Sequence, residues 1–446
     1  MKEELGIRYP VLKEDYYIKV SGSAVQKKVL RRHIRNIYLL SDDLVKVLKL
    51  MEGIKSLNDI CNILSDELKA PFDIIQKQLL QLINEFEYIE FLDKPKKRET
   101  MIIYEKPNNY PSHLDVEITN HCNFRCLYCF NESLPENKAF MDADKFISLV
   151  NKLKKNGLET VVITGGEPLT HPEIFKIVKY ACNNLVAVQL NTNGYLLPHF
   201  SKLFKDFKNL DIQITLNSST PEIHEKLSNS NIEKLHEGVI KGINIATKLG
   251  LSVTLAMNIV PENIYDIENM ANLAKKLKCK QFIVSEIEVA GRANIDLYVD
   301  TESDEIQKIL KNLNEKYEKG FFKNIEDKKY IDCIVRTNCG ILSEFLSISA
   351  EGNIQLCTFA KDYLRLNNIF ELNIDEYFKI LDQLNIMKVP EPTSDLCFGC
   401  KHYDSCSHCI YKGLLMKEQI GAKCKWGESE MVNELIKNLE SIKTSS

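Results

Sequence analysis

The sequence predicts an α/β protein built around a partial barrel of six β/α units, with a winged-helix domain before it and a cysteine-rich extension after it. Three observations predict this fold. Short β-rich runs alternate with longer helical runs across residues 112–300, three helical patterns lie between strand-like runs in residues 1–95, and eight cysteines fall within residues 330–430. Alternating strands and helices are typical of a parallel sheet.

Composition narrows the class of protein further. The chain has 446 residues, of which 44% are hydrophobic and 27% charged, with a formal net charge of −4. These values indicate a globular chain of several domains, and the near balance of charge gives no reason to expect nucleic-acid or membrane binding by the whole chain. Residues 1–4 do not resemble a signal peptide and no apolar run is long enough to span a bilayer, so we expect a cytoplasmic protein.

The N-terminal domain, residues 1–95, should combine short strands with three helices. Ser56 is a plausible N-cap for the second helix, and residues 94–111, rich in lysine and proline, are expected to form a linker. The expected elements are strands at 16–20, near 37–40 and at 88–92, and helices at about 42–51, 57–68 and 72–86. Strands flanking three helices predict a winged helix.

The central region, residues 112–300, should form the parallel sheet. In such a fold the chemistry lies where the strands end and their loops begin. A polar helical stretch should follow at about 302–329, and a last helix at 431–442. The candidate strands are 114–119, 160–164, 186–191, 212–217, 252–259 and 281–285.

Fourteen cysteines in a cytoplasmic chain favour metal ligation over disulfides, because that compartment keeps thiols reduced. Cys122, Cys126 and Cys129 follow the first expected strand as Cys-x3-Cys-x2-Cys. Three thiolates this close can ligate three irons of a [4Fe-4S] cluster and leave one iron open. A zinc site completed by the adjacent His121 is the alternative.

With its neighbouring motifs, this cysteine loop resembles that of the radical S-adenosylmethionine (SAM) enzymes. The second strand ends in Gly165-Gly166-Glu167-Pro168, like the family's Gly-Gly-Glu-Pro motif, and the third in Asn191-Thr192-Asn193-Gly194. The resemblance implies that SAM binds a [4Fe-4S] cluster on the three cysteines. It implies these cofactor-binding residues: Tyr128, Gly165, Gly166, Glu167, Pro168, Asn193, Thr215, Asn217 and Arg292.

The chain departs from the family pattern where an arginine commonly faces the SAM carboxylate. Ser228 occupies that place and carries no charge. Lys226, or Arg292 in the family-like Gly291-Arg292-Ala293, could supply the missing positive charge.

The eight later cysteines resemble the SPASM extension of radical SAM enzymes, which holds two more [4Fe-4S] clusters. The family's interleaved pairing implies one cluster on Cys333, Cys339, Cys357 and Cys409 and another on Cys397, Cys400, Cys406 and Cys424. A pair of zinc-ribbon sites is the alternative. The gap before Cys409 is one residue shorter than in relatives and contains His408, expected to be a donor near the cluster. Cys61, Cys182 and Cys279 are expected to be buried apolar residues.

The N-terminal domain has two interpretations. A local basic run of Lys27, Lys28, Arg31, Arg32 and Arg35 could contact DNA, or could be a solvated helix face. Residues 1–95 hold 15 Lys and Arg against 15 Asp and Glu, without the positive excess usual for DNA binding. The domain resembles the PqqD-like domains that bind a leader peptide at a sheet edge, and the basic run could then steer an acidic leader.

Taken together, the chain resembles radical SAM/SPASM maturases of ribosomally made peptides, and among them the sactipeptide synthases of the subtilosin type. That resemblance implies an oxidoreductase that joins a cysteine sulfur to an α-carbon within a precursor peptide. It implies SAM and three [4Fe-4S] clusters as cofactors, and a flavodoxin or ferredoxin as reductant. The alternatives are another peptide modification (a β- or γ-thioether, a carbon–carbon link or an epimerisation), a sulfatase-maturing enzyme, and a zinc-stabilised DNA-binding regulator.

Overall fold

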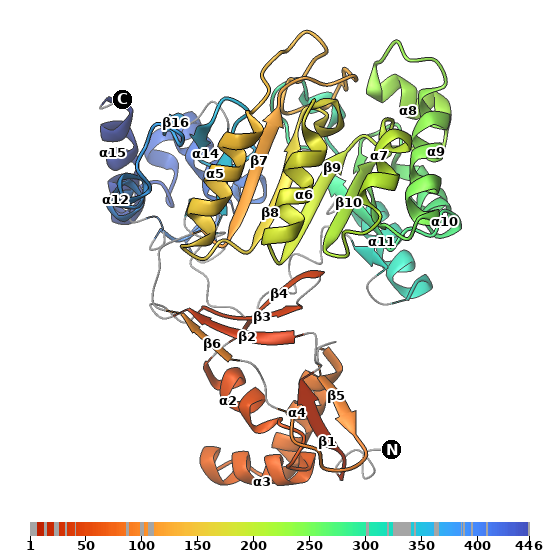
Figure 1. Ribbon diagram of the computed structural model, residues 1–446. Helices are drawn as coiled ribbons and strands as arrows, with labels where there is room; N and C mark the ends of the chain where they lie inside the picture. The colour runs from red at the N-terminus through yellow and green to blue at the C-terminus, as the bar shows by residue number, and fades with distance from the viewer. Residues whose placement is uncertain are drawn as a thin grey trace. The chain divides into compact units, whose positions relative to one another are not determined.

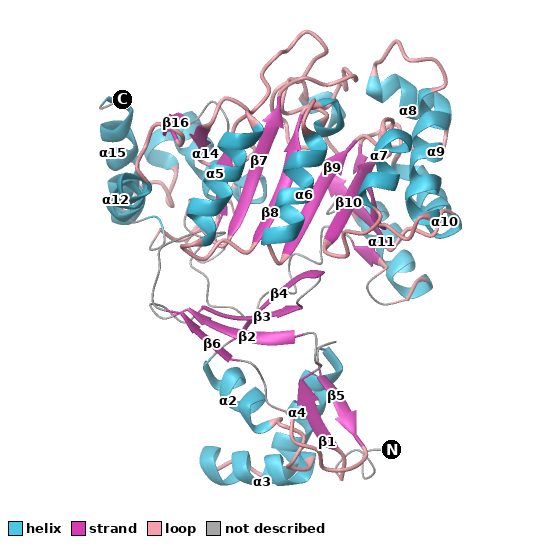
Figure 2. Ribbon diagram, viewed as in Figure 1, coloured by secondary structure: helices cyan, strands magenta, loops and turns pink. Residues whose placement is uncertain are grey.

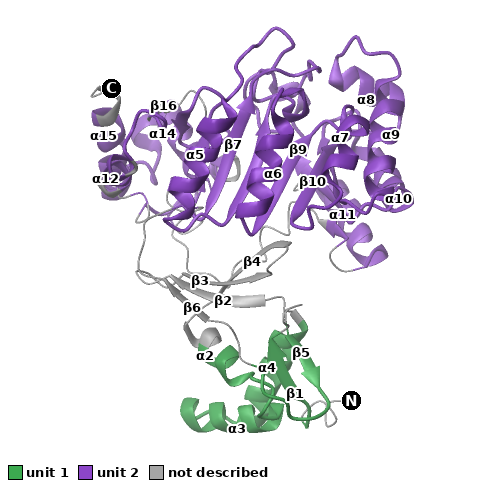
Figure 3. Ribbon diagram, in the orientation of Figure 1, with its two compact units in different colours: residues 1–108, 330–335 green, residues 109–329, 336–446 purple. Residues whose placement is uncertain are grey.

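The structure, a computed structural model, folds into two compact units (Figure 3). One consists mainly of residues 1–108, and the other of residues 109–329 and 336–446. The residues described are 7–12, 16–21, 26–31, 34–40, 42–85, 89–98, 102–105, 111–299, 303–318, 321–323, 340–342, 345–360, 365–384, 386, 389–393, 396–406 and 409–444.

In the first unit, three helices share a small core with a two-stranded antiparallel sheet. Strands β1 (Tyr9–Leu12) and β5 (Ile89–Leu92) pair, and the helices are α2 (Asp42–Leu50), α3 (Leu57–Leu68) and α4 (Phe72–Glu85). The expected capping of the second helix is confirmed: Ser56 Oγ accepts from Asp59 N while the Asp59 carboxylate accepts from Ser56 N. This reciprocal pair satisfies two backbone donors that the helix leaves free.

The first unit also contains a four-stranded sheet in the order β4-β3-β2-β6. Its strands are β2 (Tyr16–Ser21), β3 (Gln26–Arg31), β4 (Ile34–Leu40) and β6 (Ile102–Glu105). Two expectations are corrected here. Residues 94–111 are not only a linker, because β6 pairs in parallel with β2. The basic run is not a helix face, because Lys27, Lys28 and Arg31 lie on β3 and Arg35 on β4; Arg32 is outside the described residues.

The second unit is an α/β fold whose six expected strands form consecutive parallel neighbours (Figure 1). Helices α5, α6 and α7 lie over one face of this sheet (Figure 2). The strands are β7 (His113–Thr119), β8 (Thr160–Gly165), β9 (Ala187–Thr192), β10 (Leu210–Thr215), β11 (Ser252–Ile259) and β12 (Gln281–Glu286). The helices are α5 (Ala143–Lys154), α6 (Ile174–Asn184), α7 (Leu197–Phe204), α8 (Pro221–Ser228), α9 (Leu235–Lys248), α10 (Ile267–Lys276) and α11 (Asp304–Lys316).

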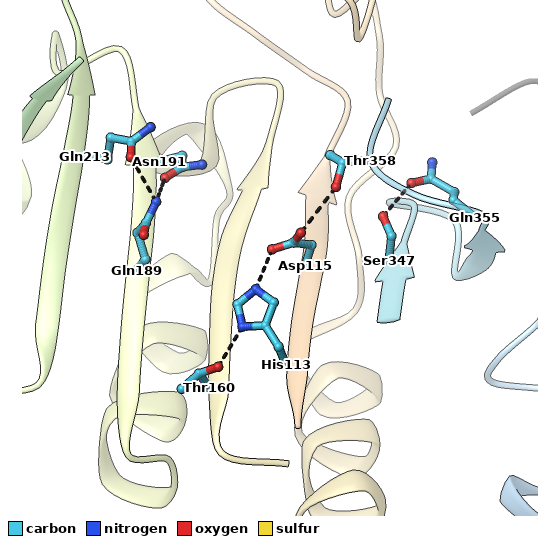
Figure 4. Close-up of polar contacts among 9 residues, drawn as sticks. All are labelled: His113, Asp115, Thr160, Gln189, Asn191, Gln213, Ser347, Gln355 and Thr358. Atoms are coloured by element: carbon cyan, nitrogen blue, oxygen red, sulfur yellow. Dashed lines mark hydrogen bonds and ion pairs between the residues drawn. The ribbon is translucent and has the colours of Figure 1, made fainter. Parts of the chain in front are cut away.

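Residues alternate between the two faces of each strand, and the two faces differ in polarity. On β7, Leu114, Val116 and Ile118 are buried in the main hydrophobic core. The opposite face is polar: Gln189 Nε2 donates to Asn191 Oδ1 at 2.6 Å and to Gln213 Oε1 at 3.1 Å (Figure 4). The sheet therefore has an apolar face that anchors helices and a polar face that is available to a ligand.

The sheet is larger than predicted and has ten strands among the described residues. Strand β13 (Phe322–Lys323) extends it beyond β12, so the helix expected at 302–329 is limited in the described residues to α11. At the other edge, β14 (Phe345–Ile348) pairs in parallel with β7, followed by antiparallel β15 (Asn353–Gln355) and β16 (Arg365–Asn368). The C-terminal extension thus continues the central sheet.

Among the described residues, four α-helices complete the C-terminal extension. They are α12 (Ile374–Leu384), α13 (Tyr403–Cys406), α14 (Ile410–Ile420) and α15 (Glu430–Thr444), the last one at the position expected for a final helix. None of the helices in the described part of the chain has the length and apolar character needed to cross a membrane.

Candidate active site

The loop that carries Cys122, Cys126 and Cys129 begins directly after β7, at the end of the sheet where the parallel strands terminate. Burial raises the pKa of the Cys126 thiol to about 12, with a further increase from the charge of Cys129. Burial, and then the charges of Cys126 and Glu167, also raise the pKa of Cys122. A bound cation would stabilise the three neighbouring thiolates and so lower the pKa values of these thiols.

The Gly165-Gly166-Glu167 turn holds the base of this loop by its backbone. Gly166 N donates to Thr119 O at 2.7 Å, and Glu167 N donates to His121 O at 2.8 Å. A Cβ atom on Gly166 would lie 2.1 Å from His121 O. The second glycine is therefore required by the close approach of two backbones, and any side chain there would displace the cysteine loop.

Glu167 is fully buried and connects two strand ends. Its Oε1 accepts from Leu169 N at 2.9 Å and Thr192 Oγ1 at 2.6 Å, and its Oε2 accepts from Asn193 N at 2.7 Å. Pro168 begins the short 3-10 turn that follows. Burial raises the pKa of Glu167 to about 7, although these three donors oppose the increase. A cationic group placed beside this carboxylate would favour its ionised form.

Asparagines at the next two strand ends reach toward the cysteine loop. After β9, Asn193 Nδ2 donates to Asn123 Oδ1 in the loop at 2.8 Å. After β10, which ends at Thr215, Asn217 is fully buried and its Oδ1 accepts from Asn258 N at 3.0 Å. Asn217 Nδ2 approaches the Tyr128 hydroxyl but has no partner in hydrogen-bonding geometry.

Arg292 spans the cysteine loop from the segment after β12. Its Nε donates to Cys126 O and its Nη2 to Ser133 O, both at 3.0 Å, while its backbone N donates to Cys129 O at 3.1 Å. Nη1 is buried and has no hydrogen-bond partner. Arg292 therefore supports the loop and still presents one unsatisfied donor.

Lys226, the other candidate for the carboxylate contact, and Ser228, which occupies the place of the family's arginine, are arranged differently. Lys226 is largely exposed and forms an ion pair with Glu262 at 3.1 Å, so it points to the surface. Ser228 is fully buried, and its carbonyl accepts from Arg125 N at 3.1 Å in the cysteine loop. The helix end that carries Ser228 thus fixes the loop backbone.

Tyr128 and His121 complete the loop. Burial raises the pKa of the Tyr128 hydroxyl well above its ordinary value, and the nearby Cys126 adds to the increase. His121 Nδ1 lies 3.1 Å from Asn137 O. A protonated Nδ1 donating to this carbonyl is occupied, which does not favour His121 as a zinc ligand through that atom.

Five of the later cysteines influence one another electrostatically. Burial, followed by the charges of Cys400 and Cys424, raises the pKa of Cys397. Burial, followed by the charges of Cys397, Cys424, Cys400 and Cys409, raises the pKa of Cys406 to about 11. Cys357 follows β15 and Cys409 caps α14.

Three other residues predicted for the later site cannot be placed. Cys333, Cys339 and His408 lie outside the described residues. The burial expected for the three scattered cysteines is confirmed: Cys61, Cys182 and Cys279 are all buried in hydrophobic cores.

The unsatisfied polar atoms test whether the site fits SAM and a cluster. Buried atoms without a hydrogen-bond partner include Arg292 Nη1, Asn217 Nδ2, Asn131 Oδ1 and Ser133 Oγ, all in or around the cysteine loop. Buried polar groups are normally satisfied, so these atoms fit a site completed by a polar ligand. No three His, Cys, Asp or Glu side chains in the described ranges already stand in a metal-coordinating arrangement. The chemistry and spacing of the thiols therefore carry the case for the cluster.

Several residues that build the site were missed by sequence reasoning. The only sequence signal for Asn123, the hydrogen-bond partner of Asn193, is its position inside the cysteine loop. The carbonyls of Leu227 and Ser228, which accept from Leu127 N and Arg125 N, leave no trace in residue type because they belong to the backbone.

A parallel α/β sheet whose first strand leads into a three-cysteine loop, held by a Gly-Gly-Glu turn, defines the radical SAM enzymes. Residues 116–274 match the family model "Radical SAM superfamily". The protein is a radical SAM enzyme, and that family implies SAM and a [4Fe-4S] cluster as cofactors.

Named relatives extend the comparison beyond this region. The chain is 26% identical over 335 residues to the antilisterial bacteriocin subtilosin biosynthesis protein AlbA of Bacillus subtilis (strain 168), covering 73% of each chain. Among solved structures, Streptococcus suis SuiB bound to precursor peptide SuiA matches with a TM-score of 0.61 at 14% identity, over 91% of this chain and 97% of that one. Native anSMEcpe with bound AdoMet matches with a TM-score of 0.54 at 16% identity, over 75% and 97%.

Proposed function

We propose that the protein is a maturase of a ribosomally synthesised peptide, and that it forms intramolecular thioether cross-links between cysteine sulfurs and α-carbons. The observation that carries this proposal is the similarity to AlbA across 73% of both chains, which is more than the 159 residues of the family model. The similarity to SuiB, whose structure is bound to precursor peptide SuiA, supports a precursor peptide as substrate.

The residues of the cysteine loop have distinct roles in this proposal. Cys122, Cys126 and Cys129 hold the cluster. Arg292 Nη1 is the donor for the SAM carboxylate, because it is buried, cationic and unsatisfied where Ser228 carries no charge. Glu167 accepts from the SAM amino group with the lone pair left after its three hydrogen bonds. When bound, SAM and the cluster supply a 5′-deoxyadenosyl radical that removes a hydrogen atom from the peptide.

The C-terminal extension, residues 330–430, would hold two auxiliary [4Fe-4S] clusters. The electrostatic influence among Cys397, Cys400, Cys406 and Cys424 supports one of these ligand sets. Forming the carbon–sulfur bond releases a hydrogen atom from carbon, a proton from the thiol, and one electron. An auxiliary cluster in this extension would supply the acceptor for that electron.

The N-terminal domain, residues 1–95, would recognise the leader part of the peptide. Its balanced charge and its small sheets fit an extended peptide added at a strand edge better than they fit duplex DNA. The full-length protein should bind the leader peptide and show only weak, salt-sensitive binding to duplex DNA. Preference for a DNA sequence would favour a regulator instead.

Mass spectrometry of the treated peptide tests the product. Each thioether should lower the peptide mass by two hydrogens and protect one cysteine from alkylation, and an α-linked thioether should open by elimination on collisional activation. A matched enzyme with Cys122, Cys126 and Cys129 replaced by Ala should leave the peptide unchanged. A loss of two hydrogens with all thiols still free to alkylation would rule out a thioether and indicate a carbon–carbon link.

A further inference from the structure

The segment that carries Cys357 is continuous with the central sheet. Cys357 lies two residues after β15, and β15 pairs with β14, which pairs in parallel with β7. In this register Ser347 lies opposite Asp115. The position of Cys357 is therefore coupled to the first barrel strand by the backbone ladder.

A chain of side-chain hydrogen bonds adds a second coupling on the polar face of the sheet (Figure 4). Thr358 Oγ1, next to Cys357, donates to Asp115 Oδ2 at 3.3 Å. Asp115 Oδ1 lies 2.9 Å from His113 Nε2, and His113 Nδ1 lies 2.6 Å from Thr160 Oγ1 on β8. We call Thr358, Asp115, His113 and Thr160 the Thr358 relay.

The surroundings of the Thr358 relay hold the Asp115 carboxylate in a fixed, partly buried position. His113 is 3% exposed and packs edge-on against Phe345, whereas the Asp115 side chain is 27% exposed. Both ring nitrogens of His113 are engaged, so the imidazole is held at a fixed angle behind the carboxylate. The Asp115 carboxylate accepts hydrogen bonds from His113 and from Thr358, the residue that follows Cys357 in the chain.

The next residue connects the same segment to the first cysteine loop. The ring of Phe359 lies 5.0 Å from the ring of Phe130, which follows Cys129. The two residues after Cys357 thus contact the barrel strand on one side and the cysteine loop on the other. This arrangement fixes Cys357 relative to Cys129.

We propose that the Thr358 relay is a positioning device that holds the Cys357 ligand against the barrel and makes the auxiliary cluster harder to reduce through the charge of Asp115. This inference rests on the proposed function, in which Cys357 ligates an auxiliary cluster. An oxidised auxiliary cluster held by Cys357 would supply the acceptor for the single electron released when the carbon–sulfur bond forms. That electron transfer would depend on the distance between the cluster and the electron donor, and on the reduction potential of the cluster.

The test uses the full chain with Cys122, Cys126 and Cys129 replaced by Ala, so that only auxiliary clusters contribute. Iron content and the midpoint potential of each cluster, followed by electron paramagnetic resonance, are measured in this parent and its variants. Asp115→Asn keeps the side-chain shape and removes the charge. Thr358→Val removes the hydroxyl at similar volume. Ser347→Ala is the matched control, because it breaks the 3.1 Å bond to Gln355 in the same hairpin without involving the relay.

We expect Asp115→Asn to raise the midpoint potential of one cluster by about 59 mV, which is a tenfold change in the equilibrium constant for a one-electron reduction. Thr358→Val should shift the same cluster, and Ser347→Ala should match the parent. Unchanged potentials in Asp115→Asn with full iron would overturn the inference, and so would an equal shift in Ser347→Ala. A parent that binds no iron would instead contradict the auxiliary clusters of the proposed function.

Discussion

Replacing Gly166 by Ala tests how the Gly-Gly-Glu turn supports the cysteine loop. The added Cβ would lie 2.1 Å from His121 O and 2.6 Å from His121 C. Both atoms belong to the backbone, so no side-chain rotation relieves the clash. The turn and the loop must separate, which weakens the hydrogen bonds from Gly166 N to Thr119 O and from Glu167 N to His121 O.

The size of the effect follows from these contacts. Overpacking of this kind costs about 1–3 kcal/mol, and each of the two hydrogen bonds contributes about 0.5–1.5 kcal/mol. The sum, about 2–6 kcal/mol, is smaller than most of the typical range of folding stability, about 5–15 kcal/mol. We therefore expect a protein that still folds, in which the loop is displaced.

The assay is iron content and SAM binding of the anaerobically reconstituted variant. Gly166→Ala should lose the iron of the first cluster and bind SAM weakly. Gly250→Ala is the control, because Gly250 has a φ of +79° and open space around its Cβ position, so it suffers backbone strain without a clash. Wild-type iron and SAM affinity in Gly166→Ala would refute the role of this close approach.

Two further predictions concern charge. Arg292→Ala should weaken SAM binding by about 1.5–3 kcal/mol, the scale of a hydrogen bond to a charged group, whereas Lys226→Ala should leave the affinity unchanged. Calorimetric titration measures both variants, and equal losses of affinity would contradict the assignment to Arg292. In the first unit, the Ser56 hydrogen bond lowers the pKa of Asp59, so the cap on α3 should be intact above about pH 4 and lost as the pH falls through the lowered pKa. Hydrogen exchange of α3 amides should show this loss in the wild type and a smaller loss in Ser56→Ala, which keeps the backbone donor to Asp59 and itself costs about 0.5–2 kcal/mol.

The six central strands and the cysteine loop could be predicted because their signals are local. Each strand is a short apolar run between turn residues, and Cys122, Cys126 and Cys129 lie within eight residues of one another. The pairing of β14 with β7 was not predictable, because a four-residue strand gives no indication of a partner more than two hundred residues away. The basic run was misplaced for a related reason: its strand character depends on pairing with β2 and β4.

In the candidate active site, the functional residues could be predicted from the sequence, but their hydrogen-bond partners could not. Glu167 and Arg292 stood out by motif, but the clamp of Arg292 on the carbonyls of Cys126 and Ser133 depends on where the loop backbone passes. Backbone carbonyls are the same in every residue, so sequence patterns do not reveal which of them accept a hydrogen bond.

The interior position of β7 has a consequence for how the protein is made. A ribosome delivers β7 and β8 long before β14, since Phe345 pairs opposite His113. Until then β7 has a free edge, and uncovered strand edges are templates for association with other chains. A chain shortened before residue 345 would keep that edge permanently, so the barrel alone should aggregate on expression where the full-length protein does not. Assembly of the catalytic core thus waits for the arrival of the extension that carries the later cysteines.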